Sequence, residues 1–279
     1  MVIKIVADST CDFTPRMAQE LGVTIVPLHV IFGDVSYREG VDITADEFYE
    51  MLVKSRQLPT TSAPSVANFQ EVYQCLLDEG HSIVSIHLSG KLSATVRMAQ
   101  AAADSLHQPG RIAVVDSQSV SLGIGFAIVE AAAAARAGAS LEEARAAAES
   151  VPGRLEVLFM VDTLEYLRRG GRIGRARAYL GTILRIKPIL AVREGELYPV
   201  ERVRTRAQGV ERIIQAAVRH QNVKLAGVAH STTPDEAELI RERMAMAFPH
   251  AQVLVARFGP VLGAHGGPGV VGIGIVEGR

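Results

Sequence analysis

The sequence has little of what stabilises small secreted proteins or anchors a chain in a membrane. Its 279 residues include only two cysteines, Cys11 and Cys75, which excludes a disulfide framework. The longest apolar run, residues 124–135, contains Glu130 and ends at Arg136, so it is too short to span a bilayer. The first residues enter a strand-like stretch without the features of a signal peptide. We therefore expect a cytoplasmic protein with no stable membrane insertion.

Several motifs of catalytic and nucleotide-binding proteins are also missing. The sequence has no phosphate loop of the Walker type and no Cys/His cluster with zinc spacing, so we expect neither a cofactor nor a metal. Residues 267–272 match a dinucleotide fingerprint by letters, but no helical pattern and no room for a ribose-binding acid follow them. Ser89 lacks the first glycine of a nucleophile elbow. Spacing alone therefore assigns no catalytic residue.

The net charge is only −1, which argues against a general nucleic-acid binder. The charges are nevertheless uneven, because residues 168–219 carry twelve Arg and one Lys against four Glu. A solvated helical face explains such a segment, and a docking surface for phosphate or an acidic partner is the alternative. Tyr179 and Tyr198 are the segment's only aromatic residues, so it has few platforms on which nucleic-acid bases could stack.

Short β-branched runs alternate with helical patterns through the first half of the chain. Strands are expected at residues 2–7, 82–88 and 111–115, with an extended segment at 23–32. Helix-start signals occur at Thr14-Pro15, at Thr44 with Glu47 and at Ser140 with Glu143. Further helices are expected at residues 65–78, 93–106 and 121–137. Strands separated by helices predict a Rossmann-like domain with a parallel sheet over residues 1–152.

A different pattern follows Val151-Pro152-Gly153, which is the best boundary signal in the sequence. Strands are expected at residues 156–161, 186–192, 196–204, 224–230, 251–257 and 270–276. Helices are expected at residues 164–169, 175–184 and 207–219, and from Thr233, which has capping-box spacing to Glu236. A hairpin around Glu194-Gly195 pairs two strands without a helix between them. We therefore predict a mixed-sheet α+β domain over residues 153–279.

Four polar loops, three of which contain glycine, interrupt these apolar elements. They are residues 59–65, 89–95, 168–173 and 265–269. Ser65 and Ser93 could simply cap helices, and a lone His265 is more often structural than a ligand contact. The loop before residue 95, however, joins a strand to a helix, and a helix N-terminus offers free N–H groups to an anion. The glycines around His265 indicate that the backbone approaches something closely there.

These loops form part of a series of segments that spans the whole chain. The series is ADST at residues 7–10, REGVDIT at 38–44, TTSAPS at 60–65, LSAT at 92–95, RRGGRI at 168–173, IKPI at 186–189, VRTR at 203–206 and HGGPG at 265–269. In this order the segments resemble the DegV family, which includes the fatty-acid-binding (FakB-like) subunit of bacterial fatty acid kinase.

The resemblance implies two α/β domains with a long-chain fatty acid held between them. It places the acid's carboxylate on Thr61, Ser62, Ser93 and His265. It also implies a FakA-like kinase that phosphorylates the bound acid with ATP, so this chain would itself be non-catalytic. The arginines implicated in that step are Arg172 and a member of the set Arg202, Arg204 and Arg206. Ala94 stands where the family usually has glycine, which bears on the preferred chain length.

The energetics agree with such a ligand. A palmitate-sized chain buries about fourteen methylenes, worth about 11 kcal/mol before association costs, so the chain supplies affinity and the polar loops supply orientation. Candidates for an apolar tunnel are Phe159, Met160, Leu180, Ile183, Leu184, Ile189 and residues 26–31, each of which could instead be ordinary core.

Two other classes of function remain open from the sequence. One is a self-sufficient serine hydrolase that uses Ser93 and His265, with Asp8 or Asp116 as the orienting acid in space. The other is a nucleic-acid or regulatory-binding protein that uses the basic segment, residues 168–219.

Overall fold

The computed structural model describes residues 2–55, 57–180 and 186–278. Its first sheet has four parallel strands, which confirms the predicted Rossmann-like architecture. From edge to edge the strands are β2 (Val23–Val26), β1 (Ile3–Asp8), β6 (Ser82–His87) and β7 (Ile112–Asp116). Because the strands are parallel, their carboxyl ends lie on the same side of the sheet, and the loops that follow β1, β6 and β7 all lie there.

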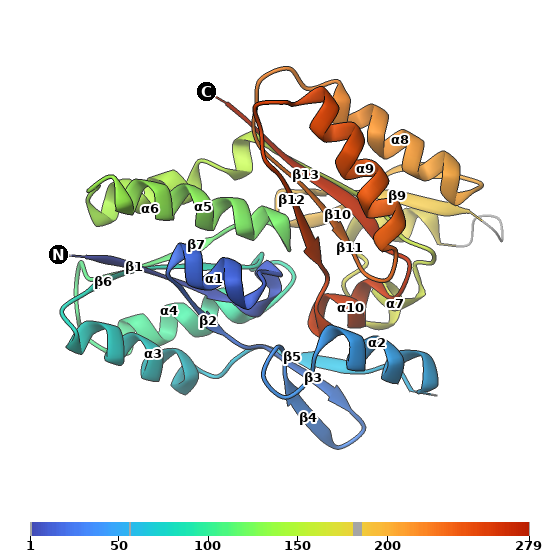
Figure 1. The fold of residues 1–279 in the computed structure, drawn as a ribbon. Coiled ribbons are helices and arrows are strands. Elements are labelled where there is room, and N and C mark those ends of the chain that lie inside the picture. The colour runs from blue at the N-terminus through green and yellow to red at the C-terminus, as the bar shows by residue number, and fades with distance from the viewer. Residues whose placement is uncertain (1, 56, 181–185, 279) are drawn as a thin grey trace.

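Helices cover both faces of this sheet (Figure 1). The helices of this part are α1 (Pro15–Leu21), α3 (Val66–Asp78), α4 (Thr95–Ser105), α5 (Leu122–Arg136) and α6 (Leu141–Glu149). Helices α3 and α4 pack on one face, and α5 and α6 pack on the other. The capping boxes at Thr44 and Ser140 are both present. Ser93 is not the N-cap residue of α4, which begins at Thr95 after Ala94, although Ser93 Oγ accepts a hydrogen bond from the Thr95 N–H at 3.3 Å.

The second sheet is mixed, as predicted, and has six strands. In order they are β10 (Glu196–Val203), β9 (Lys187–Arg193), β8 (Leu155–Met160), β13 (Val271–Glu277), β11 (Val223–His230) and β12 (Val253–Arg257). The β9–β10 hairpin turns at Glu194 and Gly195, both with positive φ. Among the described residues of this sheet, only β11 and β12 pair in parallel. Helices α8 (Arg206–Val218) and α9 (Pro234–Ala247) cover one face of this sheet.

The capping box predicted at the start of α9 is wrong. The Thr233 hydroxyl donates to the carbonyl of Val270, and the Glu236 carboxylate pairs with Arg206 instead of reaching back to Thr233. The Thr233 side chain therefore holds the loop before β13, and the Glu236 side chain holds the start of α8. Neither side chain caps the N-terminus of α9.

Helix α5 lies between the two sheets. Its residues Leu122, Ile124, Phe126 and Ile128 are all buried, as expected of a helix that is apolar around its whole circumference. One face packs on the parallel sheet and another packs on β13 of the mixed sheet. A Cβ on Gly274 of β13 would lie 2.9 Å from the Phe126 ring, so the missing side chain allows this close approach.

Sequence reasoning missed a third, small sheet and one of the helices beside it, at residues 260–266, whereas the helices after Thr44 and at residues 164–169 were predicted. The sheet contains β4 (Val35–Arg38), β3 (His29–Phe32) and β5 (Thr60–Ser62), and the nearby helices are α2 (Ala45–Lys54), α7 (Glu165–Arg169) and α10 (Pro260–Gly266). Phe48, Tyr166 and Ala264 pack in one cluster there. Residues from the first 62 positions thus contact the last 20 positions directly (Figure 1). The boundary at residue 152 stays a prediction.

Three short 3-10 segments complete the fold of the described residues. They are η1 (Ser9–Cys11), η2 (Pro152–Arg154) and η3 (Gly174–Tyr179). The helix predicted at residues 175–184 is thus a 3-10 turn as far as Tyr179, and residues 181–185 lie outside the described part of the chain.

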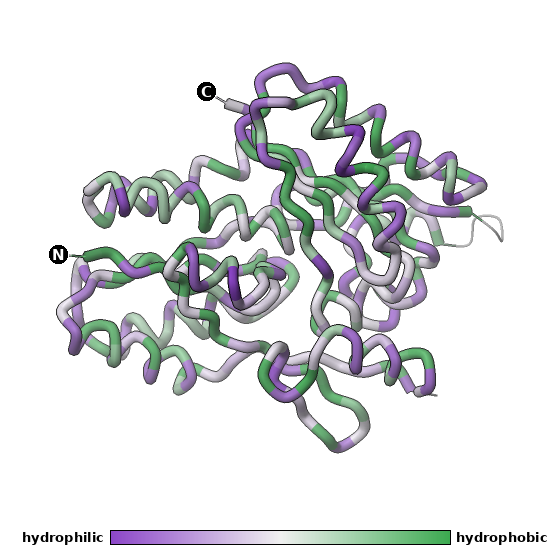
Figure 2. The backbone as a smooth tube through the Cα atoms, in the orientation of Figure 1, coloured by the Kyte–Doolittle hydropathy of each residue, from purple (hydrophilic) through white to green (hydrophobic). Residues whose placement is uncertain are grey.

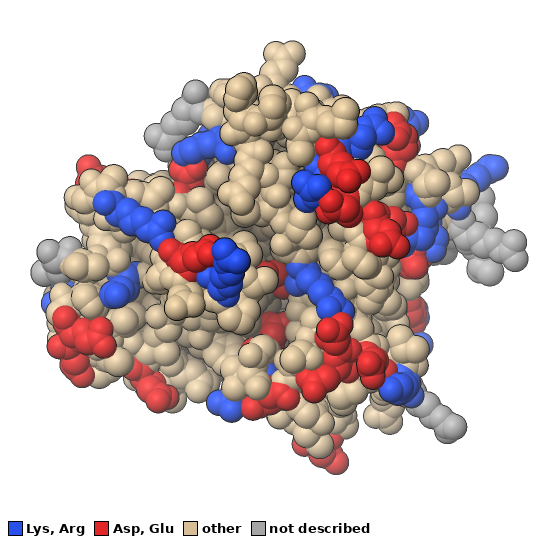
Figure 3. Space-filling view, viewed as in Figure 1, with Lys and Arg blue, Asp and Glu red and all other residues tan. Residues whose placement is uncertain are grey.

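Apolar residues concentrate in the strands and on the inner helical faces, while polar residues line the outer faces (Figure 2). None of the helices in the described part is both long enough and apolar enough to cross a membrane. On the face drawn in Figure 3, basic and acidic side chains alternate rather than gather into one basic patch.

Candidate functional site

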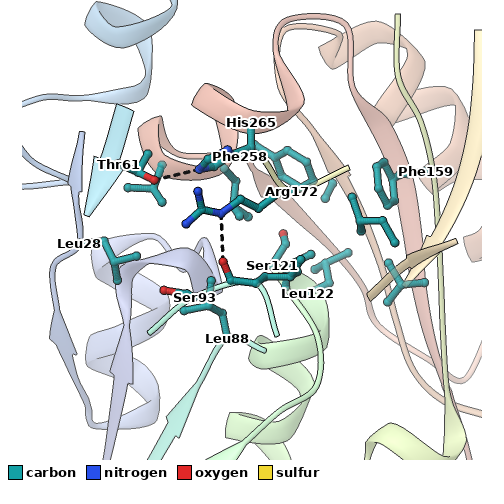
Figure 4. Close-up of a pocket in the computed structure, with 18 of the residues that line it drawn as sticks. Leu28, Thr61, Leu88, Ser93, Ser121, Leu122, Phe159, Arg172, Phe258 and His265 are labelled. Carbon is teal, nitrogen blue, oxygen red and sulfur yellow. Dashed lines mark hydrogen bonds between the residues drawn. The ribbon is translucent and has the colours of Figure 1, made fainter. Parts of the chain in front are cut away.

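A cavity lies between the two sheets, beside the N-terminal end of α5 (Figure 4). Its apolar lining includes Leu28, Leu88, Leu122, Val157, Phe159, Leu197, Ala229 and Phe258. Its polar lining comes from β5, from the loops before α4, α5 and η3, and from α10, and consists of Thr61, Ser62, Ser93, Ser121, Arg172 and His265. All four residues predicted to bind a carboxylate thus lie around one cavity, together with Arg172.

Thr61 and His265 meet at the polar end of this cavity. Thr61 Oγ1 lies 2.8 Å from His265 Nε2 (Figure 4). Burial and, to a lesser degree, the positive charge of Arg172 together lower the pKa of His265 to about 4, so the imidazole is neutral near pH 7. A neutral imidazole and a hydroxyl can each donate one hydrogen bond. One of these two hydrogens is used in the contact between Thr61 and His265, so the pair can offer the other hydrogen to an anion.

Gly170 makes room for the imidazole. A Cβ at residue 170 would lie 2.2 Å from His265 Nδ1, a distance that real side chains do not reach. His265 Nδ1 is buried and has no hydrogen-bond partner among the described residues. The RRGGRI loop and the HGGPG loop thus approach each other because Gly170 lacks a side chain, and the glycines around His265 had indicated a close approach there.

Arg172 joins this loop to the loop that carries Ser93. Its Nε donates to the carbonyl of Leu92 at 3.1 Å and its Nη1 donates to the carbonyl of Gly170 at 2.8 Å. Ser93 Oγ lies 2.9 Å from Thr95 Oγ1, in the turn that enters α4. No carboxylate of the described residues forms an ion pair with Arg172. The cavity lining therefore contains a cation whose charge is available to an anionic ligand.

The other three predicted arginines do not line the cavity. Arg202 is exposed and stacks over the Tyr179 ring at 5.0 Å, and Arg204 is exposed beside it. Arg206 pairs with Asp162 and Glu236, and its Nη1 also donates to the carbonyl of Gly269 at 2.8 Å. Arg206 therefore stabilises the HGGPG loop, whereas Arg202 and Arg204 face outward.

Three further arginines of the basic segment are paired with carboxylates. The pairs are Arg175 with Glu196, Arg212 with Glu201 and Arg219 with Glu156. These ion pairs within the chain neutralise part of the excess positive charge of residues 168–219, so that part does not require a binding partner.

The predicted tunnel lining is partly right. Phe159 lines the cavity, and so does Leu28 from the range 26–31. Met160 and Ile189 were wrong, because they belong to the core under α8 and α9. Phe159 and Met160 pack in the cores on opposite faces of β8, as the alternation of side chains along a strand requires, and Met160 is not among the lining residues. Leu180 is 41% exposed, and Ile183 and Leu184 lie outside the described residues.

Sequence reasoning missed Ser121 as a lining residue. It was expected to be the first residue of a helix, but its φ of 51° and ψ of −123° set it apart from α5. Few residues other than glycine adopt this conformation. The backbone N–H of Ser121 donates to the carbonyl of Thr10, which fixes the turn between β7 and α5 beside the cavity.

Comparisons with known proteins bear directly on this architecture. The family model described as "Uncharacterised protein, DegV family" matches residues 2–278. A DegV domain-containing protein of Halalkalibacterium halodurans is 37% identical over 276 residues, which is 97% of each chain. Protein DegV of Bacillus subtilis is 34% identical over 98% of each chain.

The chain belongs to the DegV family. A solved structure described as fatty acid binding of a DegV family protein, from Thermus thermophilus, has a TM-score of 0.92 and 36% identity, over 99% of this chain and 100% of that one. The structure of Bacillus subtilis DegV, described as a fatty acid binding protein, has a TM-score of 0.89 and 33% identity over all of both chains. A stearic acid-binding protein from Eubacterium ventriosum has a TM-score of 0.90 and 26% identity, over 99% of this chain and 98% of that one.

The geometry of this DegV protein argues against a serine hydrolase built on Ser93 and His265. A triad needs an acid at the imidazole nitrogen that faces away from the serine, and His265 Nδ1 has no such partner among the described residues. Asp8 is bound to His87 and Leu88, and Asp116 accepts from the N–H groups of Gly90 and Gln118. Neither candidate acid orients His265. The described residues also contain no cluster of three metal-ligating side chains.

Proposed function

We propose that this protein binds a long-chain fatty acid in the cavity between its two sheets. The observation that carries the proposal is an apolar cavity whose polar groups include a neutral His265, the Thr61 hydroxyl and a cation, Arg172. The related proteins from Thermus thermophilus and Bacillus subtilis, described as fatty acid binding, support the same ligand class.

The two kinds of lining divide the work of binding. Burial of about fourteen methylenes contributes about 11 kcal/mol before the cost of association, so the apolar walls supply most of the affinity. A buried carboxylate without donors would be costly. Thr61, Ser62, Ser93 and His265 can supply those donors, and Arg172 balances the charge. The carboxylate thereby stays ionised.

An ionised, oriented carboxylate is a nucleophile, which supports a further step. In this proposal a FakA-like kinase brings ATP to the protein in the cytoplasm, and a carboxylate oxygen attacks the γ-phosphorus. The new oxygen–phosphorus bond replaces the bond to ADP and leaves an acyl phosphate. Arg172 stabilises the charge on the transferred phosphoryl group, and the outward-facing Arg202 and Arg204 contact the kinase. This chain carries the substrate and is not itself the catalyst.

The test is acyl-phosphate formation, trapped as the hydroxamate, from palmitate and ATP with a FakA-like kinase. We expect product only when kinase and this protein are both present, and a rate that falls as salt rises. Arg204→Ala should keep its palmitate affinity and lose rate, whereas Arg243→Ala on α9 is the matched control. Product from either protein alone, or an Arg204→Ala rate equal to wild type, would contradict the presentation step.

A further inference from the structure

Two buried carboxyls from the N-terminal part of the chain hold the start of α10. Glu39 Oε1 accepts a hydrogen bond from the Val261 N–H at 2.7 Å, and Asp12 Oδ1 accepts one from the Gly259 N–H at 3.0 Å. The side chains are nearly inaccessible, with exposures of 5% for Glu39 and 8% for Asp12. Between the two donors lies Pro260, which has no N–H. The two carboxyls thus satisfy the backbone donors on either side of it.

The fit between Glu39 and the helix is close. A Cβ on Gly259 would lie 2.5 Å from Glu39 Oε1, so residue 259 has no space for a side chain. Glu39 is itself fixed on its other side, because Ser9 Oγ donates to Glu39 Oε2 and accepts from the Leu28 N–H at 3.0 Å. The Glu39 N–H donates to the Leu28 carbonyl at 2.9 Å. The start of α10 is therefore tied to Leu28, which lines the cavity wall.

Helix α10 needs such ties because it has only seven residues. Isolated helices of this length are not stable in water, so tertiary contacts decide where the helix lies. Ala264 packs against Phe48 and Tyr166 along its side, and the two carboxyls hold its first turn. His265 comes four residues after Val261, about one helical turn along the axis. A displacement at the start of α10 is thus passed to the imidazole. Neither Glu39 nor Asp12 lines the cavity itself.

We propose that Glu39 and Asp12 are positioning residues for the head-group end of the cavity. They fix the start of α10, and α10 in turn places His265 against Thr61. The part of this proposal that concerns ligand affinity rests on the proposed fatty-acid binding, but the part that concerns His265 does not.

The test compares Glu39→Leu, which removes both acceptor oxygens, with Glu39→Gln, which keeps one. The first readout is the ¹⁵N NMR signals of the His265 ring in ligand-free protein, assigned with His265→Ala. The second is affinity for palmitate and for hexadecanol, which has the chain but no carboxylate. A positioning role predicts that Glu39→Leu shifts the His265 signals and weakens palmitate by about tenfold, with hexadecanol affinity nearly unchanged. Glu39→Gln should restore both readouts toward wild type.

Two further variants complete the design. Asp42→Leu, at an exposed carboxyl paired with Arg38, is the matched control and should leave His265 unchanged. Gly259→Ala keeps Glu39 but pushes on it from the helix side, and it replaces Glu39→Leu if that variant does not fold. Unshifted His265 signals in folded Glu39→Leu or Gly259→Ala, or equal losses for palmitate and hexadecanol, would overturn the proposal. If wild type binds neither lipid, the proposed function fails, and the His265 signals still decide the positioning role.

Discussion

His265 Nε2 lies 2.8 Å from Thr61 Oγ1, although 204 positions separate the two residues. The contact joins α10, near the end of the chain, to β5, in its first quarter. It closes the polar end of a cavity whose walls come from both sheets. A head group bound there would therefore touch a strand from the first quarter of the chain and a helix near its end.

The first prediction concerns the division between chain and head group. Ser93→Ala removes one donor from the polar end, and one hydrogen bond contributes about 1 kcal/mol against about 11 kcal/mol for the methylenes. We expect the dissociation constant for palmitate to rise less than about tenfold in a fluorescence displacement titration. Ser105→Ala, at the exposed C-terminal end of α4, is the control. Complete loss of lipid retention in Ser93→Ala would show that the polar end supplies most of the affinity.

Arg172 should act on the ligand as well as on the kinase step, because its side chain lines the cavity. In Arg172→Ala the buried carboxylate loses its balancing charge, and Leu92 and Gly170 lose a hydrogen-bond donor. We expect palmitate affinity to fall by about tenfold and hexadecanol affinity to change little. Calorimetric titration of both ligands measures this. Unchanged palmitate affinity would place the guanidinium outside the head-group site.

The raised pKa of Glu39 predicts the direction in which this residue changes the free energy of unfolding with pH. Burial raises its pKa from the ordinary 4.5 to about 7. Because the folded protein keeps this proton up to about pH 7 and the unfolded chain releases it near 4.5, the unfolded chain binds fewer protons in that interval. The contribution of Glu39 to the free energy of unfolding therefore falls as the pH rises through the interval and is constant above it. The titratable groups around Glu39 are Asp8, Cys11, Asp12 and Tyr49.

Glu39→Gln removes the titrating carboxyl, so this variant lacks the decrease in the free energy of unfolding that Glu39 causes as the pH rises. Relative to wild type, the variant should gain up to about 3 kcal/mol between pH 5 and pH 8 in urea unfolding. His265 contributes with the opposite sign between about pH 4 and its ordinary 6.5, but it does so in both proteins and cancels in the difference. The exposed Glu71→Gln serves as the control. A difference that stays constant with pH would mean that Glu39 ionises in its ordinary range.

The length of the bound chain should respond to the apolar wall. Ala229 lines the cavity and is 4% exposed, so Ala229→Leu fills space that an acyl chain would occupy. Each displaced methylene removes about 0.8 kcal/mol of binding. In competition among saturated acids of graded length, we expect the optimum to move to shorter chains, with Ala207→Leu on the exposed side of α8 unchanged. An unchanged optimum for Ala229→Leu would place the acyl chain elsewhere.

Local signals in the sequence were enough to predict most strands of the two larger sheets, several helix starts and one hairpin turn. The caps at Thr14, Thr44 and Ser140 mark helix starts through residues within three positions of each other, so they can be recognised without the fold. The Glu194-Gly195 turn predicted its hairpin for the same reason.

Elements that depend on distant partners were not predictable in this way. Strand β5 has three residues and exists through pairing such as Val30 with Thr61, and α10 depends on Glu39 and Asp12 at its start. The motifs of the DegV family nevertheless identified Thr61 and His265, which meet across these two elements. The prediction of the tunnel lining failed for Met160 because side chains alternate between the two faces of a strand. The sequence does not show which of Phe159 and Met160 faces the cavity.

The central claim is that the cavity holds a long-chain fatty acid. The most direct measurement is mass spectrometry of the organic extract of the purified wild-type protein, quantified per chain against a lipid-free protein purified in parallel. The account predicts a long-chain fatty acid, close to one per chain, that is displaced by added palmitate. An extract with no fatty acid above the parallel control, from a folded protein that also fails to take up palmitate, would contradict it.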